Sequence, residues 1–354
     1  MGSEFGGHNA MKILVRGTNW IGDAVMTVPA VRALRQLFPD AHIALHTRAW
    51  AEGIFADSGL FDEIISFDAA GSKLKSILSQ AKSLRPHKFD LAVLFPNSFE
   101  SALVAGLVRI ERRFGFATDG RKLLLTDAIP VPEWKNERHE VFYYLELIAA
   151  IEKSYFGSET ARNTQMEPSL DVSADKHAIG RRLLREFGLD LSKRTVALAA
   201  GSANSRAKRW SVESYAELND KLQSEISVNV ILLGAKDETD VSESICSRSS
   251  IKPIDLTGKT NLTEAAAVLS EVDLLISNDM GLAHLAPAVG TETLVIFGPT
   301  NPATTRPMSG YAEVIRADGI ECSPCMLRDC PIDHRCMTRV SVKEVFQKAS
   351  AKLK

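Results

Sequence analysis

The sequence predicts an α/β protein built from two doubly wound domains that face each other across a cleft. Three observations support this prediction. From Met11 onward, short aliphatic runs alternate with longer segments of helical period, which is typical of a parallel sheet covered by helices on both faces. The alternation is interrupted by a polar stretch in the middle of the chain and then resumes. The 354 residues are enough for two domains of ordinary size.

The expected strands are runs of β-branched and aliphatic residues in each half of the chain. In the first half they are Lys12–Arg16, His42–Thr47, Glu63–Phe67, Phe89–Phe95 and Arg113–Ala117. In the second half they are Thr195–Ala199, Val228–Leu233, Ile254–Leu256, Asp273–Ser277 and Thr293–Phe297. Helices are expected between them, including Val212–Ile226 and Leu262–Val272.

Changes in composition predict the boundaries. Residues 1–10 are polar and glycine-rich and are interpreted as an expression tag. The N-terminal domain is expected at 11–165 and the C-terminal domain at 166–340, with the polar stretch Glu152–Lys176 as the linker. Ser341 and Glu344 have the spacing of a capping box, so 341–354 is expected to be a helix, for which packing back on the N-terminal domain is one arrangement.

The charge balance and hydropathy exclude several classes of protein. The chain has 42 basic and 44 acidic side chains, so its formal net charge of −2 predicts no general attraction to nucleic acid. No apolar run approaches the roughly 20 residues that span a bilayer, and the start of the chain does not resemble a signal peptide. A cytoplasmic protein is therefore expected.

The loop Gly17–Asp23 follows the first expected strand and lies where doubly wound sheets bind ligands. It matches neither a Walker A loop nor Gly-x-Gly-x-x-Gly. Gly22 permits close backbone approach. Asp23 has two interpretations, a helix N-cap worth about 1 kcal/mol or a general base that faces the cleft. Helix amides lower the pKa of a carboxylate, so a base at this position would have to point away from them.

Two further loops after strands have the residues of a diphosphate site. The helix expected to start at Met280, Gly281 and Leu282 offers free amides, and Gly281 lets a phosphate approach the backbone. Asp279 and His284 flank this start, although a plain cap and a core histidine are the alternatives. The loop Ala199–Trp210 carries cations suited to a leaving diphosphate, or else it is a solvated basic loop. No Asp-x-Asp motif occurs in the chain, so no metal is expected at this site.

Four cysteines and one basic segment leave several interpretations open. Cys322, Cys325, Cys330 and Cys336 have metal-like spacing that is atypical of structural zinc sites, so free thiols are favoured over a metal site or a disulfide. Between Arg109 and Lys122, five cations stand against two acids. This segment either binds phosphate groups or anionic lipid, through Arg112 and Arg113 in particular, or forms a solvated face.

Several segments together resemble one family. They are RGTNWIGDAVMTVPAVRAL from Arg16, LFPNSFESALVAGL from Leu94, AKRW from Ala207, SNDMGLAHLAPAVG from Ser277, FGPTNP from Phe297 and CSPCMLRDCP from Cys322. The set resembles the ADP-heptose:lipopolysaccharide heptosyltransferases, most closely the type II enzymes. The resemblance implies a GT-B fold of two Rossmann-like domains. It also implies an inverting, metal-independent glycosyltransferase without a cofactor, which moves L-glycero-D-manno-heptose from ADP-heptose to the first heptose of the lipopolysaccharide inner core.

The resemblance also implies roles for single residues. Asp23 matches the proposed base of the family, and Lys208 matches its diphosphate lysine. The expected donor-binding residues are Ser202, Lys208, Asp279, Met280, Gly281, Leu282 and His284. The expected acceptor-binding residues are Thr18, Asn19, Gly22, Asn97, Ser98, Arg112 and Arg113. One essential carboxylate suffices, because a sugar hydroxyl needs a base while ADP is already a good leaving group.

The implied partners are ADP-heptose, the heptosyl-Kdo-lipid A acceptor and, transiently, the cytoplasmic face of the membrane, with no nucleic acid. Three alternatives stay open. The donor can be another nucleotide sugar, the acceptor can be that of a type I or type III enzyme, or the chain can be a nucleotide-sugar binding protein without activity.

Overall fold

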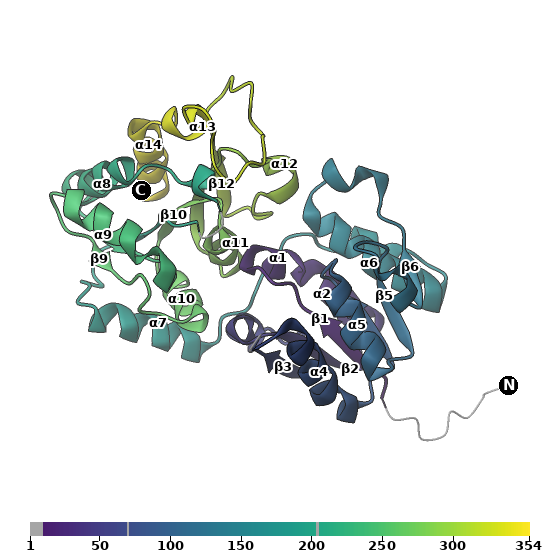
Figure 1. The fold of residues 1–354 in the computed structure, drawn as a ribbon. Helices are drawn as coiled ribbons and strands as arrows, with labels where there is room; N and C mark the ends of the chain where they lie inside the picture. Colours follow the sequence, from purple (N-terminus) through teal and green to yellow (C-terminus); the bar gives the residue numbers. More distant parts are fainter. Residues whose placement is uncertain (1–9, 69–70, 203–204) are drawn as a thin grey trace. The chain divides into compact units, whose positions relative to one another are not determined.

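The computed structural model describes residues 10–68, 71–202 and 205–354, and the chain divides into two compact units (Figure 1). The first unit contains residues 10–19 and 27–166, and the second contains 20–26 and 167–354. This division lies one residue from the expected boundary. Trp20–Met26 groups with the second unit although it follows the first strand directly, which the sequence pattern does not predict.

The first unit is built on a six-stranded sheet with the order β3-β2-β1-β4-β5-β6. All of its strand pairs are parallel, with Ile13 opposite both Ile43 and Leu91 in the centre. The strands are β1 (Lys12–Arg16), β2 (His42–Arg48), β3 (Glu63–Phe67), β4 (Leu91–Leu94), β5 (Arg112–Phe116) and β6 (Asp127–Ile129). Helices cover this sheet, which explains why its central strands read as continuous apolar runs.

The helices of the first unit connect these strands. They are α2 (Val28–Leu37), α3 (Glu52–Phe55), α4 (Lys73–Leu84), α5 (Phe99–Val108) and α6 (Glu140–Phe156), with the 3₁₀ turns η1 (Ala49–Ala51), η2 (Arg85–His87), η3 (Arg121–Leu124), η4 (Glu133–Asn136) and η5 (Thr160–Asn163). Apolar side chains of α4 and α5 share one core with Leu14 and Ala92 of the sheet. The helices α2 and α6 pack against each other.

The second unit repeats this plan with a parallel sheet of order β12-β11-β10-β7-β8-β9. Its strands are β7 (Thr195–Ala199), β8 (Asn229–Leu232), β9 (Ile254–Asp255), β10 (Leu274–Asn278), β11 (Glu292–Ile296) and β12 (Ala312–Ile315). Its helices are α1 (Ile21–Met26), α7 (Ala174–Glu186), α8 (Val212–Lys221), α9 (Thr239–Arg248), α10 (Leu262–Leu269), α11 (Gly281–Ala288), α12 (Pro302–Thr305), α13 (Arg335–Thr338) and α14 (Val342–Lys352), with the turns η6 (Arg206–Lys208), η7 (Leu222–Ile226) and η8 (Lys236–Glu238). Two parallel sheets flanked by helices confirm the predicted fold class.

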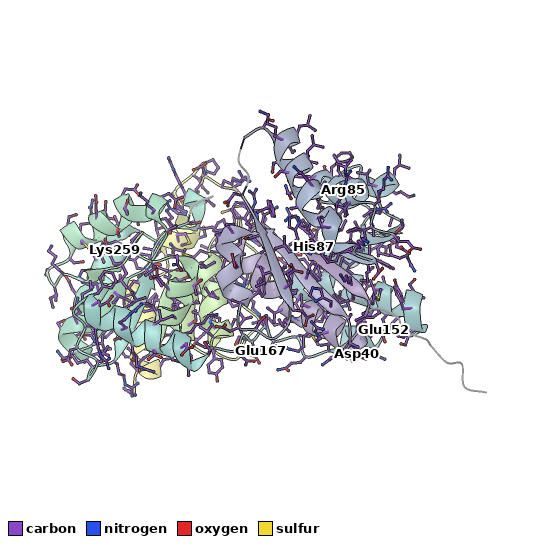
Figure 2. The ribbon with its side chains drawn as sticks, turned by 90° about the horizontal axis from the view of Figure 1, so that it is seen from below. Asp40, Arg85, His87, Glu152, Glu167 and Lys259 are labelled. Carbon is purple, nitrogen blue, oxygen red and sulfur yellow. The ribbon has the colours of Figure 1, made fainter. Side chains whose placement is uncertain are left out.

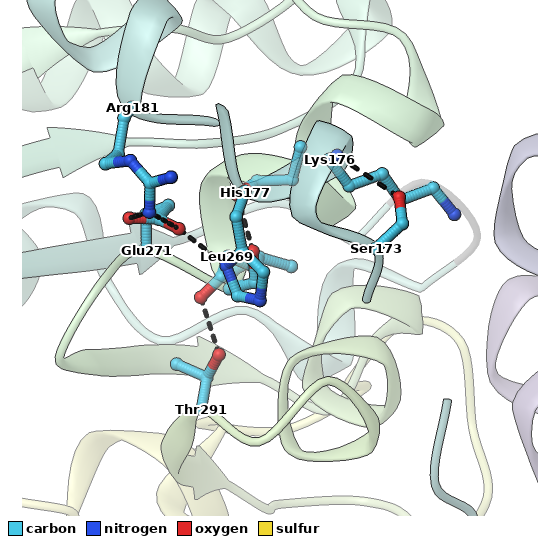
Figure 3. Close-up of polar contacts among 9 residues, drawn as sticks. Ser173, Lys176, His177, Arg181, Leu269, Glu271 and Thr291 are labelled. Atoms are coloured by element: carbon cyan, nitrogen blue, oxygen red, sulfur yellow. Dashed lines mark hydrogen bonds and ion pairs between the residues drawn. The ribbon is translucent and has the colours of Figure 1, made fainter. Parts of the chain in front are cut away.

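The packing of α7 on α10 shows how small residues fix this unit. A Cβ on Gly180 would lie 2.2 Å from the carbonyl oxygen of Ala267, so only glycine permits the helices to approach this closely. Polar contacts then lock the pair, because Glu271 accepts from His177 Nδ1 at 2.6 Å and from Arg181 Nη1 at 3.2 Å (Figure 3).

The region expected to be a linker is more ordered than its composition indicates. The helix α6 continues to Phe156 and carries Glu152 (Figure 2). The buried Glu152 carboxylate accepts from the Ser158 and Thr160 hydroxyls at 2.7 and 2.6 Å. Burial raises the pKa of Glu152, but these hydrogen bonds and one from the Ala161 amide outweigh it and lower the pKa to about 2. The second unit opens at Glu167, which accepts from Ser309 Oγ at 2.6 Å (Figure 2).

The C-terminal helix and two edge strands are the elements that the sequence predicts least well. The helix α14 packs on α8 and β11 of the second unit, where Val342, Val345 and Ala349 join the main core. The helix α14 therefore has its core contacts in the second unit, and the arrangement on the N-terminal domain stays a prediction. The strands β6 and β12 are absent from the predicted set, because each is a short strand at a sheet edge.

Within the described residues, no helix combines the length and apolar character that crossing a membrane requires.

Candidate active site

The centre of the candidate site is the carboxyl end of β10, where the fully buried Asn278 ties three segments together. Its amide nitrogen donates to the carbonyl oxygens of Ala200 and Gly201 at 2.7 and 3.2 Å, so it holds the loop after β7. Its oxygen accepts from the Trp210 amide at 3.0 Å and the Tyr215 hydroxyl at 3.2 Å. Asn278 thus fixes the backbone on both sides of Lys208, a role that was not predicted for it.

Asp279 follows Asn278 and forms a buried charged pair with Lys208. Asp279 Oδ2 lies 2.8 Å from Lys208 Nζ and accepts from the Thr300 hydroxyl at 2.6 Å. Asp279 is not the N-cap of α11, because Met280 occupies that position and makes no side-chain cap hydrogen bond. The plain-cap alternative is therefore wrong. The first amides of α11 have no side-chain acceptor from the cap, which suits an anion at this helix start.

The loop before Trp210 is structured rather than simply solvated. Arg209 donates to the Ser202 carbonyl at 3.1 Å, and its buried Nε has no partner among the described residues. Lys208 keeps 26% of its side chain exposed, so it is accessible to a ligand while paired with Asp279. The alternative of a solvated basic loop holds for the exposed Arg206 alone.

A second buried carboxylate lies at the carboxyl ends of β7 and β8. Glu238 is buried beside Gly201 and Gly234, and a Cβ on Gly201 would lie 1.9 Å from the Glu238 carboxylate. Glu238 accepts from the Ala235 amide at 2.9 Å, and burial raises its pKa. The sequence signal that could have found it is the pair of acids Asp237 and Glu238, which follows Gly234 in the loop after β8.

The helix α1 places Asp23 against the same unit. A Cβ on Gly281 would lie 2.7 Å from Ile21 Cβ, and a Cβ on Gly22 would lie 3.0 Å from His284 Cδ2. Glycine at these two positions therefore permits α1 to pack on α11. Ile21 lies where a Cβ of Gly281 would point, so this glycine serves the packing of the two helices. The expected approach of a phosphate to its backbone stays a prediction.

Asp23 and His284 have more specific positions than the sequence indicates. Asp23 is the third residue of α1, since the Ala24 amide already donates to the Trp20 carbonyl at 2.8 Å. The N-cap interpretation is therefore wrong. His284 is buried against Gly22 of α1. Asp23 and His284 thus belong to one packed pair of helices at the start of α11.

In the first unit, three of the expected acceptor residues meet at one edge of the sheet. Thr18 follows β1, and Asn97 and Ser98 follow the neighbouring β4. The buried Thr18 hydroxyl has no hydrogen-bond partner among the described residues. Asn97 Oδ1 accepts from the Tyr143 hydroxyl at 3.2 Å, and Ser98 caps α5. Asn19 is exposed directly after Thr18.

Arg121 holds the loop after β4 through hydrogen bonds. The sequence predicted it only as part of a basic patch. It is fully buried and donates to the Phe116 carbonyl at 2.9 Å, to Ser101 Oγ at 3.1 Å and to the Pro96 carbonyl. Burial lowers the pKa of Arg121 to about 10. Arg121 therefore shapes the loop that carries Asn97 and Ser98.

Arg112 and Arg113 lie elsewhere. Both are at the amino end of β5, whereas Asn97 follows the carboxyl end of β4. Arg112 binds Asp127 through two hydrogen bonds of 2.9 and 2.7 Å, and Arg113 donates to the carbonyls of Leu124 and Ile110. The expectation that these two arginines bind acceptor phosphates is therefore corrected to a structural role.

The four clustered cysteines are unbonded thiols, and no three metal-ligating side chains in the described residues form a group that could hold a metal ion. The segment that carries these cysteines forms hydrogen bonds with the loops that hold Thr300 and Lys208. The Cys325 amide donates to the Pro299 carbonyl at 3.0 Å, next to Thr300. His334 Nε2 lies 2.6 Å from the Ala207 carbonyl, next to Lys208.

Comparison with known proteins gives consistent matches. The family model for glycosyltransferase family 9 (heptosyltransferase) matches residues 77–335. Lipopolysaccharide heptosyltransferase 2 of Escherichia coli (strain K12) is 30% identical over 316 residues, which cover 86% of this chain and 88% of that protein. Lipooligosaccharide heptosyltransferase 2 of Campylobacter jejuni is 28% identical over 97% of this chain and 99% of its own. The structure of E. coli ADP-heptose LPS heptosyltransferase II has a TM-score of 0.83 at 27% identity, covering 97% of this chain and 98% of that one.

Proposed function

The chain belongs to glycosyltransferase family 9, the heptosyltransferases, and on that premise we propose that it transfers heptose from ADP-heptose to the first heptose of the lipopolysaccharide inner core. The observation that carries this proposal is the Lys208–Asp279–Thr300 cluster beside the start of α11. It combines an accessible cation with helix amides, which is the chemistry that a nucleoside diphosphate requires.

Within this proposal, the donor occupies the carboxyl edge of the second sheet. Its diphosphate binds Lys208 and the amides of Met280, Gly281 and Leu282, with Ser202 and Arg209 lining the loop opposite. The Glu238 carboxylate accepts from the ribose hydroxyls, as acidic residues do in dinucleotide-binding domains. Glycine at 201 and 234 lets the loop backbone lie close to the carboxylate, since a Cβ at either position would come within 3.0 Å of it.

The proposed reaction exchanges one glycosidic bond for another. An acceptor hydroxyl attacks the anomeric carbon of the donor heptose, and the bond between that carbon and the diphosphate oxygen breaks. The hydroxyl proton passes to Asp23, and ADP leaves with its charge balanced by Lys208 and the α11 amides. A single direct displacement inverts the anomeric configuration.

The proposed acceptor residues are those at the carboxyl edge of the first sheet. Thr18, Asn19, Asn97 and Ser98 offer hydroxyl and amide groups that suit a sugar, and Gly22 leads into Asp23. Because the acceptor sugar is attached to a lipid, we propose that the protein works in the cytoplasm, at the inner face of the cytoplasmic membrane.

An assay of acceptor-dependent ADP release tests the proposal. With ADP-heptose and an acceptor that carries one heptose, ADP release should exceed the acceptor-free background by more than tenfold. The Asp23→Asn variant should release ADP only at background rate while retaining the thermal stabilisation by ADP. Equal ADP release with and without acceptor would contradict a transfer reaction, and stronger stabilisation by UDP or GDP would indicate another donor.

A further inference from the structure

Four large apolar side chains are exposed on one layer of the first unit. Leu74 and Leu78 of α4 are 64% and 52% exposed, and Leu123 of η3 is 95% exposed. Phe99, the first residue of α5, is also exposed. The core side of α4 is filled by other residues, such as Ile77, so the exposed pair is not required for packing within the unit. Contiguous exposed apolar side chains of this kind mark interaction surfaces.

The four side chains lie on adjacent elements. The helix α4 lies beside α5 (Figure 1). The helix α5 packs on η3, and all three elements contribute to the same core. The helices α4 and α5 each follow a parallel strand, so their first turns lie at the carboxyl edge of the sheet. Leu74 and Phe99 are therefore placed at the edge that also carries Thr18, Asn97 and Ser98.

Cations are interspersed with these apolar side chains. Lys73, Lys75 and Lys122 are exposed, and residues 71–89 contain no acidic residue. Two acidic residues, Glu100 and Asp119, lie close in sequence to Phe99 and Leu123, and both accept hydrogen bonds. Asp119 accepts from the Phe99 amide at 2.7 Å, and Glu100 accepts from Gln80 Nε2 at 3.3 Å. Leucine and phenylalanine mixed with lysine is the composition of surfaces that lie in the interface of anionic membranes.

We infer that this set, Leu74, Leu78, Phe99 and Leu123 with Lys73, Lys75 and Lys122, is a membrane-docking surface for anionic phospholipid. The charge of the lysines complements anionic headgroups, and the apolar side chains enter the boundary between headgroups and acyl chains. This inference rests on the proposed function in one respect, because a lipid-linked acceptor requires the enzyme to work at a membrane. The surface deepens that proposal by naming the residues that make the contact.

Docking through this surface has a consequence for the acceptor. The membrane would lie along the carboxyl edge of the first sheet, so the sugars of a lipid in that membrane start near Thr18, Asn97 and Ser98. Of the basic segment expected from the sequence, this surface keeps Lys122, whereas Arg112, Arg113 and Arg121 are engaged inside the unit.

Vesicle sedimentation without donor or acceptor tests the inference. The full chain should bind vesicles that contain phosphatidylglycerol at least tenfold more tightly than vesicles of phosphatidylcholine. The double variant Leu74→Ser/Leu78→Ser should weaken binding about tenfold. Its matched control is Leu191→Ser/Ile251→Ser, which removes two exposed apolar side chains of the second unit and should leave binding unchanged.

The charge contribution is tested in the same assay. Lys73→Glu/Lys75→Glu should abolish the preference for anionic vesicles, while Lys193→Glu/Lys343→Glu makes the same change in net charge elsewhere and should preserve it. Equal binding to both vesicle types, or equal losses in the surface variants and their controls, would overturn the inference. Absence of vesicle binding together with self-association that Leu74→Ser/Leu78→Ser abolishes would assign the surface to a second copy of the chain, and would overturn it too.

A transfer assay separates this inference from the proposed function. Leu74→Ser/Leu78→Ser should keep wild-type turnover on a deacylated, water-soluble acceptor and lose about tenfold on the same acceptor embedded in vesicles. Loss on both acceptors would refute a docking role. Wild-type protein that binds anionic vesicles but transfers to neither acceptor would contradict the proposed function and leave the docking surface supported.

Discussion

The variant Lys208→Ala tests two roles of the ion pair between Lys208 and Asp279. One is its contribution to stability, and the other is the stabilisation of the leaving diphosphate. Asp279 is buried, and its Oδ2 receives both Lys208 Nζ at 2.8 Å and the Thr300 hydroxyl at 2.6 Å. In Lys208→Ala the carboxylate keeps only the hydroxyl among these two partners. Breaking a fully buried pair costs about 3–5 kcal/mol. Lys208 is 26% exposed, so solvent screening reduces the expected loss in the free energy of unfolding to about 2 kcal/mol.

A second substitution tests the origin of this loss. Asp279→Asn in the Lys208→Ala background removes the uncompensated charge, so the free energy of unfolding should recover to within about 1 kcal/mol of wild type. Transfer should not recover, because the leaving diphosphate still lacks its cation. Loss of one such electrostatic contact typically lowers kcat by about 100-fold or more.

The assay is urea unfolding of the single and double variants alongside turnover with saturating acceptor. Lys221→Ala is the control, because it removes a half-buried surface lysine that pairs with the exposed Glu225 at 2.9 Å and should change stability by less than about 0.5 kcal/mol. A double variant less stable than Lys208→Ala would refute the claim that the unpaired Asp279 causes the loss. Wild-type turnover in Lys208→Ala would refute its role in departure of the diphosphate.

Three further predictions follow from single positions. Asp23→Asn should lower kcat by about 100- to 10,000-fold, while the affinity for ADP, measured by calorimetry, stays within twofold of wild type. A loss of ADP affinity as large as the loss of kcat would contradict a role as base. Gly281→Ala should destabilise the protein by about 1–3 kcal/mol because its Cβ meets Ile21, and Ile21→Ala/Gly281→Ala should restore part of the melting temperature. Glu152 has a pKa lowered to about 2 in the folded state, so its stabilisation is present above the unfolded pKa near 4.5 and is lost as pH falls toward 2. Glu152→Gln should remove at most about 3 kcal/mol of stability at pH 7 and flatten the acid limb of the stability profile, and an unchanged acid limb would contradict the hydrogen-bond explanation.

Much of the fold is readable from the sequence for a physical reason. Central strands of a parallel sheet are covered on both faces, so β1, β7 and β10 appear as continuous apolar runs with clear ends. The edge strands β6 and β12 were missed because only one neighbour and part of the core contact them, so their sequences DAI and AEVI carry no such run.

The grouping of Trp20–Met26 with the second unit could not be predicted from a local sequence pattern, unlike the central strands. It depends on Gly22 against His284 and Ile21 against Gly281, contacts between residues far apart in the chain. A glycine in a loop predicts conformational freedom or close approach, but it does not say what approaches. The same limit explains why the contact between Gly281 and Ile21 was not predicted.

The candidate site divides in a similar way. Lys208 and Asp279 were predicted individually from their loops, but their direct pairing and the Thr300 hydroxyl depend on three separate loops meeting. Asn278 is one polar residue at the end of β10, and Glu238 is one of several acids in the loop after β8. Neither has a local pattern that reveals its burial. Arg112 and Arg113 show the opposite error, since a run of cations is visible while its partners Asp127 and the backbone carbonyls are not.

The mass of the acceptor is the most direct test of heptose transfer. Purified protein is incubated with ADP-heptose and Kdo-lipid A that carries one heptose, and the product is analysed by mass spectrometry beside the Asp23→Asn variant. Addition of a single heptose by the wild type and none by the variant is the predicted result. An unchanged acceptor mass despite bound ADP, or addition to an acceptor that lacks the first heptose, would contradict the proposed reaction.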